Sequence, residues 1–371
     1  MNWWWGRKSA PDLRPLVPEW LGSESSDGLA TGYAAQFDDV YRRNPVGLRA
    51  VRLVAGMLGG LEVHAAEGDE AAARIVRTDG LLEGIAANLL LHGNAYVQLL
   101  GGDDAPIDLL QLRPERVSVV ADERGWPVAY LYRAAGQSTR LARVDALGRR
   151  QVTHLKSLHP RDDHYGLGCL EAALPAASIH NRAAKWNKAL LDNAARPSGA
   201  LSYEPGDGAS LSTEQFDRLR EELAREFSGS GNAGRPLLLD GGLKWQAMSL
   251  TPADMDFVAL KEAAARDIAL AFGVPPVLVG LPGDATYANA REAGRALYRQ
   301  TILPMATRIL SGLSDLLGDW LGPVRLAVDT DQLSELSADR ANLWAQVNAA
   351  TFLSDVEKRE MLGFPAKPEA A

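Results

Sequence analysis

Apolar residues recur at spacings of three and four between residues 251 and 320, and prolines divide this stretch in two. The first half predicts a helix with one buried face, which carries Phe257, Ala264, Ile268 and Phe272. Thr251 and Pro252 supply a cap and a first helical residue. The pair Pro275-Pro276 is expected to end the helix, because proline lacks an amide hydrogen and its ring clashes with the preceding turn.

A second helix is expected to begin at either Thr286 or Asn289, the latter with Glu292 as its capping partner. The apolar positions in its second half keep the helical spacing: Leu303, Ala306, Leu310, Leu313, Leu317 and Trp320. Pro304 lies inside this pattern. Because the apolar spacing continues beyond Pro304, the sequence predicts a kink in one long helix rather than its end.

The first half of the chain mixes helices with short strands. A helix is expected from Asn44-Pro45 to Gly59-Gly60, and a second over residues 79–92. Four short alternating runs separated by turn residues predict strands: 96–99, 117–120, 128–132 and 152–155. We interpret this region as a mostly antiparallel β region supported by a few helices.

A further helix is predicted over residues 170–195, with one apolar stripe made of Ile179, Ala183, Trp186 and Leu190. A small α/β unit follows, with a strand at 199–203, a helix capped by Ser212, and a hairpin around Asp240-Gly241 that pairs 236–239 with 243–248. The end of the chain predicts a strand at 324–329 and two short helices, the second capped by Ser354 with Glu357.

Composition narrows the class of protein. A chain of 371 residues with 46% hydrophobic and 23% charged residues is typical of a globular protein with one to three cores. The single cysteine, Cys169, excludes an internal disulfide framework and indicates a reducing compartment. No apolar run approaches the roughly 18 residues of a membrane span, and no signal peptide is apparent, so we expect no membrane association.

The net charge of −8 argues against a protein that grips nucleic acid tightly, since such affinity comes from Lys and Arg that neutralise phosphates. It is compatible with a protein past which DNA slides. Residues 1–43 are interpreted as an N-terminal arm with little regular structure. Its Trp3-Trp4-Trp5 run could anchor at a membrane interface, but we favour burial of the indoles against a partner.

Motifs of enzyme chemistry are weak. The Gly-rich run 229–234 is followed by Arg235-Pro236 instead of the Gly-Lys-Ser/Thr of a nucleotide-binding loop, so we expect no ATP hydrolysis, no cofactor and no enzyme. One alternative is a metal-dependent hydrolase built on a cluster of potential ligands within residues 154–164: His154, His159, Asp162, Asp163 and His164. The spacing of five places the histidines neither on one helix face nor on one strand face, which favours a polar surface loop.

Three arginines four positions apart form a basic ladder on the second long helix: Arg291, Arg295 and Arg299. They could face DNA phosphates or form salt bridges within or between subunits. Acidic residues that could serve as partners are Asp254, Asp256 and Glu262.

Six motifs, in the same order, resemble those of the HK97-type portal proteins of tailed bacteriophages. They are Leu91-His92-Gly93-Asn94-Ala95-Tyr96, the run 166–173, the run 193–199, Gly234-Arg235-Pro236 with Leu243-Lys244-Trp245, the run 268–276, and Thr286-Tyr287-Ala288-Asn289. Each motif alone is weak, but together they identify the chain as similar to this family, of a phage or of a phage-derived gene transfer agent.

The resemblance implies an α+β portal fold that assembles as a ring, usually a dodecamer, at one vertex of the capsid of a virion or virus-like particle. Assembly would take place in the cytoplasm of the bacterial host. The implied partners are identical subunits, the double-stranded DNA that passes through a central channel, the terminase large subunit, the head–tail adaptor and the major capsid protein. No metal or cofactor is implied.

The resemblance also assigns segments. These are an N-terminal arm (1–43), a wing (44–167), a first stem helix (168–197), a clip (198–250), a second stem helix (251–276), a tunnel loop (277–288), a kinked helix with a wing strand (289–330) and a short helical crown (331–371). The residues expected to line the channel at the tunnel loop are Gly283, Asp284, Ala285, Thr286 and Tyr287. The ladder Arg291, Arg295 and Arg299 is expected at the channel or between subunits, and the clip interface is expected to contain Phe216, Arg235, Lys244 and Trp245.

Overall fold

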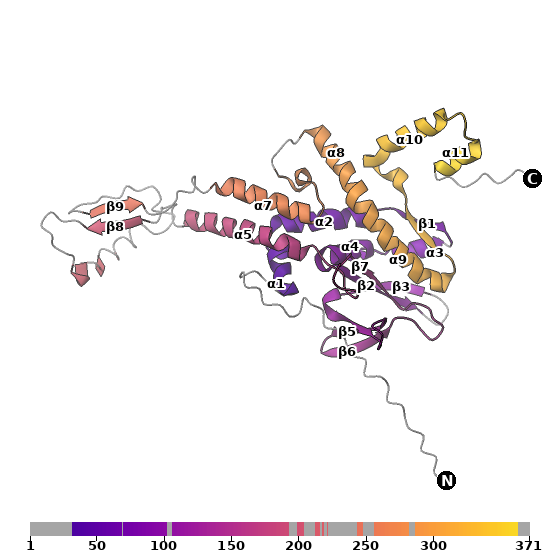
Figure 1. Ribbon diagram of the computed structural model, residues 1–371, viewed down its shortest axis with the longest axis horizontal. Coiled ribbons are helices and arrows are strands. Elements are labelled where there is room, and N and C mark those ends of the chain that lie inside the picture. Colours follow the sequence, from indigo (N-terminus) through magenta and orange to yellow (C-terminus); the bar gives the residue numbers. More distant parts are fainter. Residues whose placement is uncertain are drawn as a thin grey trace, which may run out of the picture.

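The computed structural model describes residues 32–68, 70–101, 106–192, 199–203, 212–215, 217–218, 221, 243–247, 256–281 and 286–362. Figure 1 shows a body of helices and small sheets from which two antiparallel helices, α5 and α7, project to one side. A two-stranded ribbon, β8 and β9, lies beyond the far end of this helix pair. The mixed α+β class expected from the sequence is confirmed.

Two packed helices organise the N-terminal part of the body. Helix α2 (Pro45–Gly59) begins at Asn44, whose side chain accepts hydrogen bonds from the amides of Val46 and Gly47 at 3.0 Å, so the predicted cap is confirmed. It packs against α4 (Leu81–His92), which ends at Gly93. Three short helical segments were not predicted: α1 (Tyr33–Phe37), the π-helix η2 (Asp38–Arg42) and α3 (Glu70–Val76).

The body contains two three-stranded antiparallel sheets. In one, β2 (Asn94–Gly101) lies between β3 (Pro106–Leu112) and β7 (Val152–Lys156). In the other, β5 (Pro127–Ala134) lies between β4 (Val117–Ala121) and β6 (Gln137–Ala142). All four predicted strands are present, whereas β3 and β6 were missed because their mixed composition has no clear alternation.

The second long helix crosses the body as a single rod (Figure 1). It consists of α8 (Tyr287–Leu297), a π-helical turn (Tyr298–Ile302) and α9 (Leu303–Leu321). Pro304 falls in the first turn of α9, where its missing amide costs little, and the wider turn before it accommodates the ring. The prediction that the helix continues past Pro304 is confirmed, and where a kink was predicted the structure has a π-helical turn just before the proline; the helix starts at Thr286, not Asn289.

Helix α9 is the centre of the main hydrophobic core. Its buried side chains include Ala306, Leu310, Leu313 and Leu317, as the sequence predicted. It approaches β7 so closely that a Cβ added at Gly312 would lie 2.3 Å from the Leu155 side chain. A smaller second core joins the two sheets: Tyr96, Leu112, Val117, Val119, Tyr130, Val152 and Tyr165.

The C-terminal part of the chain first adds a strand to the body and then forms two further helices. Strand β10 (Arg325–Val328) pairs antiparallel with β1 (Val63–Glu67), which joins segments far apart in the sequence. Helices α10 (Ser337–Ala349) and α11 (Asp355–Met361) follow. The predicted cap of α11 is confirmed, because the Glu357 carboxylate accepts from the Ser354 amide at 2.8 Å.

The projecting helix pair consists of α5 (Leu170–Asp192) and α7 (Phe257–Ala271). Helix α7 begins later than predicted, since Asp256, in a left-handed conformation, caps it with a bond from the Ala259 amide at 3.2 Å. The predicted Thr251 cap lies outside the described residues. At the far end, β9 (Leu243–Ala247) pairs with β8 (Gly199–Tyr203), and the predicted hairpin partner 236–239 also lies outside the described residues.

Candidate functional site

The base of α5 is a crossing of two backbone segments at which three glycines meet. Gly93, with φ +79°, follows α4, and Gly166 and Gly168 precede α5. A Cβ at Gly166 would lie 2.1 Å from the Gly93 carbonyl oxygen, and one at Gly168 would lie 2.6 Å from the Leu91 carbonyl oxygen. Only glycine permits this approach of one backbone to another. The crossing fixes the point at which α5 leaves the body.

A buried asparagine holds this crossing together. The side-chain oxygen Oδ1 of Asn94 accepts from the Gly166 amide at 2.7 Å and from His154 Nε2 at 2.9 Å. Its amide nitrogen donates to the carbonyl oxygens of Gly166 and His92 at 3.0 and 3.1 Å. A fully buried amide with its donors and acceptor satisfied specifies one arrangement of the loops around it. The motif 91–96 therefore has a structural role at the base of α5.

His154 belongs to this network and not to a metal site. Its ring stacks on Tyr96 with centroids 4.1 Å apart, and burial lowers its pKa to about 3. His159 Nδ1 accepts from the Arg161 amide, and Asp162 accepts from the amides of His164 and Tyr165. Within the described residues no three His, Cys, Asp or Glu side chains converge on a point that could hold a metal ion. The cluster proposed for a hydrolase is therefore not assembled.

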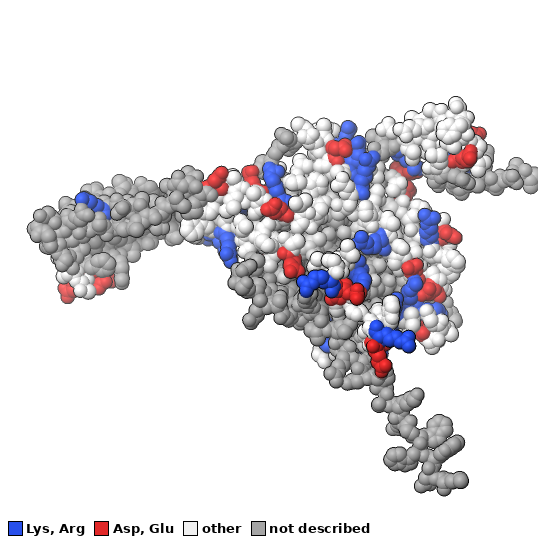
Figure 2. All heavy atoms as spheres, in the orientation of Figure 1, with Lys and Arg blue, Asp and Glu red and all other residues white. Residues whose placement is uncertain are grey.

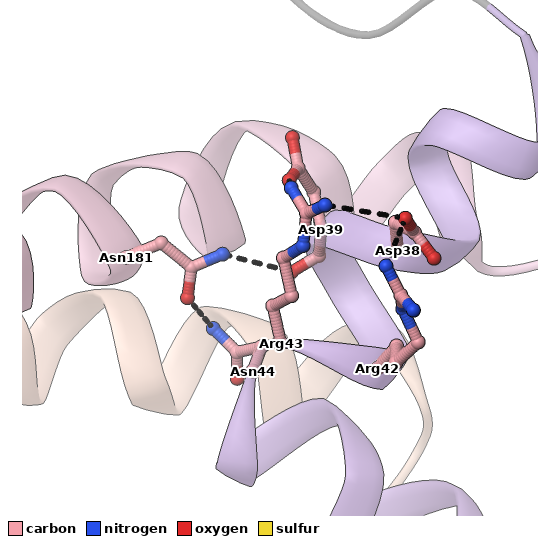
Figure 3. A network of polar contacts seen from close by, with 6 residues as sticks. All are labelled: Asp38, Asp39, Arg42, Arg43, Asn44 and Asn181. Carbon is pink, nitrogen blue, oxygen red and sulfur yellow. Dashed lines mark hydrogen bonds and ion pairs between the residues drawn. The ribbon is translucent and has the colours of Figure 1, made fainter.

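A polar network anchors the first half of α5 to the N-terminal helices (Figure 3). Asn181 of α5 donates to the Asp39 carbonyl oxygen at 2.8 Å and accepts from the Asn44 amide nitrogen at 3.0 Å. Beside it, two ion pairs share one carboxylate: Arg42–Asp38 at 2.7 Å and Arg43–Asp38 at 3.4 Å. Since Asn44 also caps α2, one side chain joins α2 to α5. Asn181 of α5 is thus held both by Asn44, which caps α2, and by the backbone at Asp39.

Small side chains line the contact between α5 and α7. Ala177 and Ala183 of α5, and Ala264 and Ala265 of α7, are all buried, which lets the helix axes approach closely. Further out, the rings of Trp186 and Phe257 stack with centroids 6.2 Å apart. The predicted inner face of α7 is confirmed by the burial of Ala264, Ile268 and Phe272.

The outer faces of the same two helices carry large apolar side chains in contact with solvent. Leu270 is 75% exposed and Val258 69% exposed, and three more are exposed by more than two fifths: Ile179, Trp186 and Leu260. Of the predicted stripe on α5, Ala183 is buried, whereas Ile179 and Trp186 are exposed, and the side chain of Leu190 lies outside the described ones. Both helices of the pair therefore present large apolar side chains to solvent.

The chain leaves α7 through a looser turn. Gly273, with φ +66°, ends the helix, and its carbonyl oxygen accepts from the Thr301 hydroxyl at 2.9 Å. A short 3-10 helix (Pro276–Val279) follows and ends at Gly280. Of the predicted tunnel-loop residues, Gly283, Asp284 and Ala285 lie outside the described residues. Thr286 caps α8 with a bond from the Asn289 amide at 3.2 Å, and the Tyr287 side chain is 84% exposed.

The arginine ladder is not a uniform row in the structure. Arg295 forms an ion pair at 2.9 Å with Glu292 on the same helix, and none of the three predicted acidic partners appears in this pair. Arg299 lies in the π-helical turn, which rotates it away from the regular spacing of α8. Arg291 and Arg299 are exposed.

The predicted clip residues are only partly described. Lys244 is exposed on β9, and Trp245 pairs with Leu201 of β8 in the ribbon register. Phe216 and Arg235 lie outside the described residues. The structure therefore does not test whether these four side chains share a surface.

Charge is distributed without a dominant sign over the face in Figure 2, where blue and red side chains alternate across the body. Burial raises the pKa of the Cys169 thiol to about 11, which makes it a poor nucleophile. Among the described residues, no helix has the length and apolar composition that a bilayer crossing requires.

Comparisons with known proteins agree with one another. A family model described as "Phage portal protein" matches residues 45–363. An uncharacterized protein of Rickettsia bellii is 43% identical over 283 residues, which is 76% of this chain and 72% of that one. The probable portal protein of Streptomyces phage phiC31 is 29% identical over 249 residues, 64% of this chain and 52% of that one.

Solved structures show the same likeness. A chain in the virion of a native gene transfer agent particle is 42% identical and superposes with a TM-score of 0.70, over 90% of this chain and 94% of that one. The match to the neck of the native particle, computed with C12 symmetry, has a TM-score of 0.67. An HK97 family portal protein from Corynebacterium diphtheriae, at 17% identity and a TM-score of 0.55, shows the fold alone.

Proposed function

This chain is a member of the phage portal protein family, and we propose that it forms the ring at one capsid vertex through which double-stranded DNA enters and leaves a phage or gene-transfer-agent particle. The observation that carries the proposal is the set of large apolar side chains that both helices of the pair expose to solvent. Large exposed apolar patches mark surfaces that associate. A closed ring of identical subunits covers two flanks of every copy without leaving an edge.

Within this proposal the body is the wing, and α5 and α7 are the stem helices beside the channel. The ribbon β8–β9 is part of the clip, which would meet the terminase large subunit during packaging and the head–tail adaptor afterwards. Helices α10 and α11 are the crown. The match to a chain from the virion and neck of a gene transfer agent particle supports this location. The wing would face the major capsid protein.

The mechanism we propose is passive. The terminase supplies the work of packaging, while the ring provides the dock, the aperture and a check on backflow. The segment 282–286 contains Gly283, Asp284, Ala285 and Thr286, whose small or polar side chains suit a constriction that yields to DNA of any sequence. An overall charge of −8 suits a conduit, because strong phosphate binding would stall the DNA.

Deleting residues 283–285 in the host that makes the particles tests the channel assignment. We expect particles of normal appearance with less nuclease-protected DNA, measured by quantitative amplification from purified particles. Gly318→Ala is a matched control, since its added Cβ would meet only the Val324 amide nitrogen, at 3.9 Å. Unchanged protected DNA in the deletion variant would argue against a tunnel loop at this position.

A further inference from the structure

The β4–β5–β6 sheet differs in charge from the rest of the chain. Residues 113–150 contain eight arginines, no lysine and four carboxylates, a net charge of +4 in a chain whose net charge is −8. Six of these arginines are exposed, and the five that lie in the strands of the sheet, directly beside them in sequence or in the turn between β4 and β5 form what we call the arginine patch: Arg116, Arg124, Arg133, Arg140 and Arg143. Charge of one sign is therefore concentrated on one small sheet.

The register of the sheet places two patch residues side by side. Arg140 of β6 pairs with Leu131 of β5, and Arg133 pairs with Ser138, so Arg133 and Arg140 are diagonal neighbours on one face, about 7–8 Å apart. The opposite face carries Tyr130, which is buried in the second core. The face that carries Arg133 and Arg140 thus belongs to a sheet whose other side is packed.

Two of the four carboxylates in this segment are already engaged. Asp122 accepts from the amides of Arg124 and Trp126, and Asp145 accepts from the Leu147 amide and pairs with Arg149 at 2.8 Å. In the described part of the chain, no carboxylate forms an ion pair with any member of the patch. Other arginines do have such partners, for example Arg340 with Asp331 at 2.7 Å. The patch keeps its positive charge available for an external anion.

We propose that the arginine patch is a binding surface for the phosphate backbone of double-stranded DNA, separate from the channel. Interfaces with DNA are much more positively charged than interfaces between proteins. Arginine presents a planar fork of donors that matches phosphate. The surface binds the backbone without reading sequence, because contacts to phosphate carry no information about the bases. This inference goes beyond the proposed function and does not depend on the channel.

The test uses the full-length purified protein and closed circular duplex DNA, which has no end to thread through a preformed ring. Binding is measured by filter retention between 50 and 200 mM salt. If all five arginines neutralise phosphates, log K falls against log salt with a slope of about −4.5. The double variant Arg133→Gln/Arg140→Gln is expected to reduce the magnitude of this slope by about 2.

The matched control is Arg49→Gln/Arg52→Gln, which removes the same charge from two exposed positions on α2. It is expected to leave the slope unchanged. Equal loss of binding in both double variants would overturn the proposal, because only total charge would then matter. Retention of poly-L-glutamate as strong as that of DNA would also overturn it, since it would indicate a protein partner that presents carboxylates. Negative-stain images of each variant show whether assembly is intact.

Discussion

The helix pair joins the body at two places, before α5 and after α7, and each place contains a turn that depends on glycine. The two turns are built differently. At the base of α5, Gly93, Gly166 and Gly168 bring two backbones into contact, and Asn94 ties them together. After α7, Gly273 makes one side-chain bond, with Thr301, and the chain then leads to the exposed Tyr287. The first turn fixes a direction, and the second leaves the start of α8 lightly held. Under the proposed function, a stem that stays aligned next to a loop that yields to DNA would require this difference.

The largest effect is expected from Gly166→Ala. The added Cβ would lie 2.1 Å from the Gly93 carbonyl oxygen and 2.7 Å from the Ser157 amide, so the backbones must separate. We expect a loss of about 4 kcal/mol in the free energy of unfolding, measured by urea denaturation. Gly56→Ala, where nothing lies within 4 Å, should instead be neutral or stabilise α2 by up to about 1 kcal/mol. A loss below 1 kcal/mol for Gly166→Ala would mean that the crossing is not tight.

Asn94→Ala removes the side chain that satisfies the buried Gly166 amide and carbonyl. We expect a loss of about 3 kcal/mol, because the partners remain buried without hydrogen bonds. The same urea experiment measures it, and the hydrogen exchange of the Gly166 amide should rise in parallel. Protection of that amide equal to the wild type would contradict its assignment to Asn94.

Acid should weaken the base of α5. Burial lowers the pKa of His154 to about 3 and that of His92 to about 4, so the unfolded chain binds protons below pH 6.5 while the folded chain does not. The contribution that these two neutral histidines make to stability is therefore fully present above pH 6.5 and is lost as the pH falls towards 4. We expect about 2 kcal/mol per histidine between pH 7 and 5. In His154→Gln the loss of stability between pH 7 and 5 should be smaller by the amount expected for one histidine. A loss equal to that of the wild type would contradict the prediction.

The smallest effect is expected at the second turn. Thr301→Val removes the bond to the Gly273 carbonyl oxygen and keeps the shape of the side chain, so the free energy of unfolding should fall by about 1 kcal/mol. If the loss equalled that of Asn94→Ala, the two turns would be equally rigid and the contrast between them would disappear.

The sequence predicted well where a local rule decides the structure. The caps at Asn44, Ser354 and Thr286 and the apolar spacing of α9 depend on neighbours within one or two turns. It failed where the deciding contact is distant. The Asn94 network joins residues 72 positions apart, and the pairing of β1 with β10 joins the two ends of the body. The repeated small residues at 166 and 168 were the only local signal of the crossing.

The stripe on α5 is a different case. The sequence placed Ile179 and Trp186 on one apolar stripe but did not show what covers it, and both side chains are exposed in one subunit. The stripe is real in the sequence, and a neighbouring copy would bury it. The resemblance was enough to name the candidate tunnel loop. The exposure of the apolar side chains on α5 and α7 could be recognised only in the structure.

Negative-stain microscopy of the purified chain tests most directly whether the exposed apolar side chains of α5 and α7 join identical subunits. We expect rings with a central hole for the wild type and monomers for Leu270→Asp, with the same free energy of unfolding per subunit. Leu147→Asp is the matched control, because Leu147 is 77% exposed, close to the 75% of Leu270, but lies on a turn of the body. It should still form rings. Monomers of the wild type under assembly conditions, or rings of Leu270→Asp as frequent as those of the wild type, would contradict assembly through the helix pair.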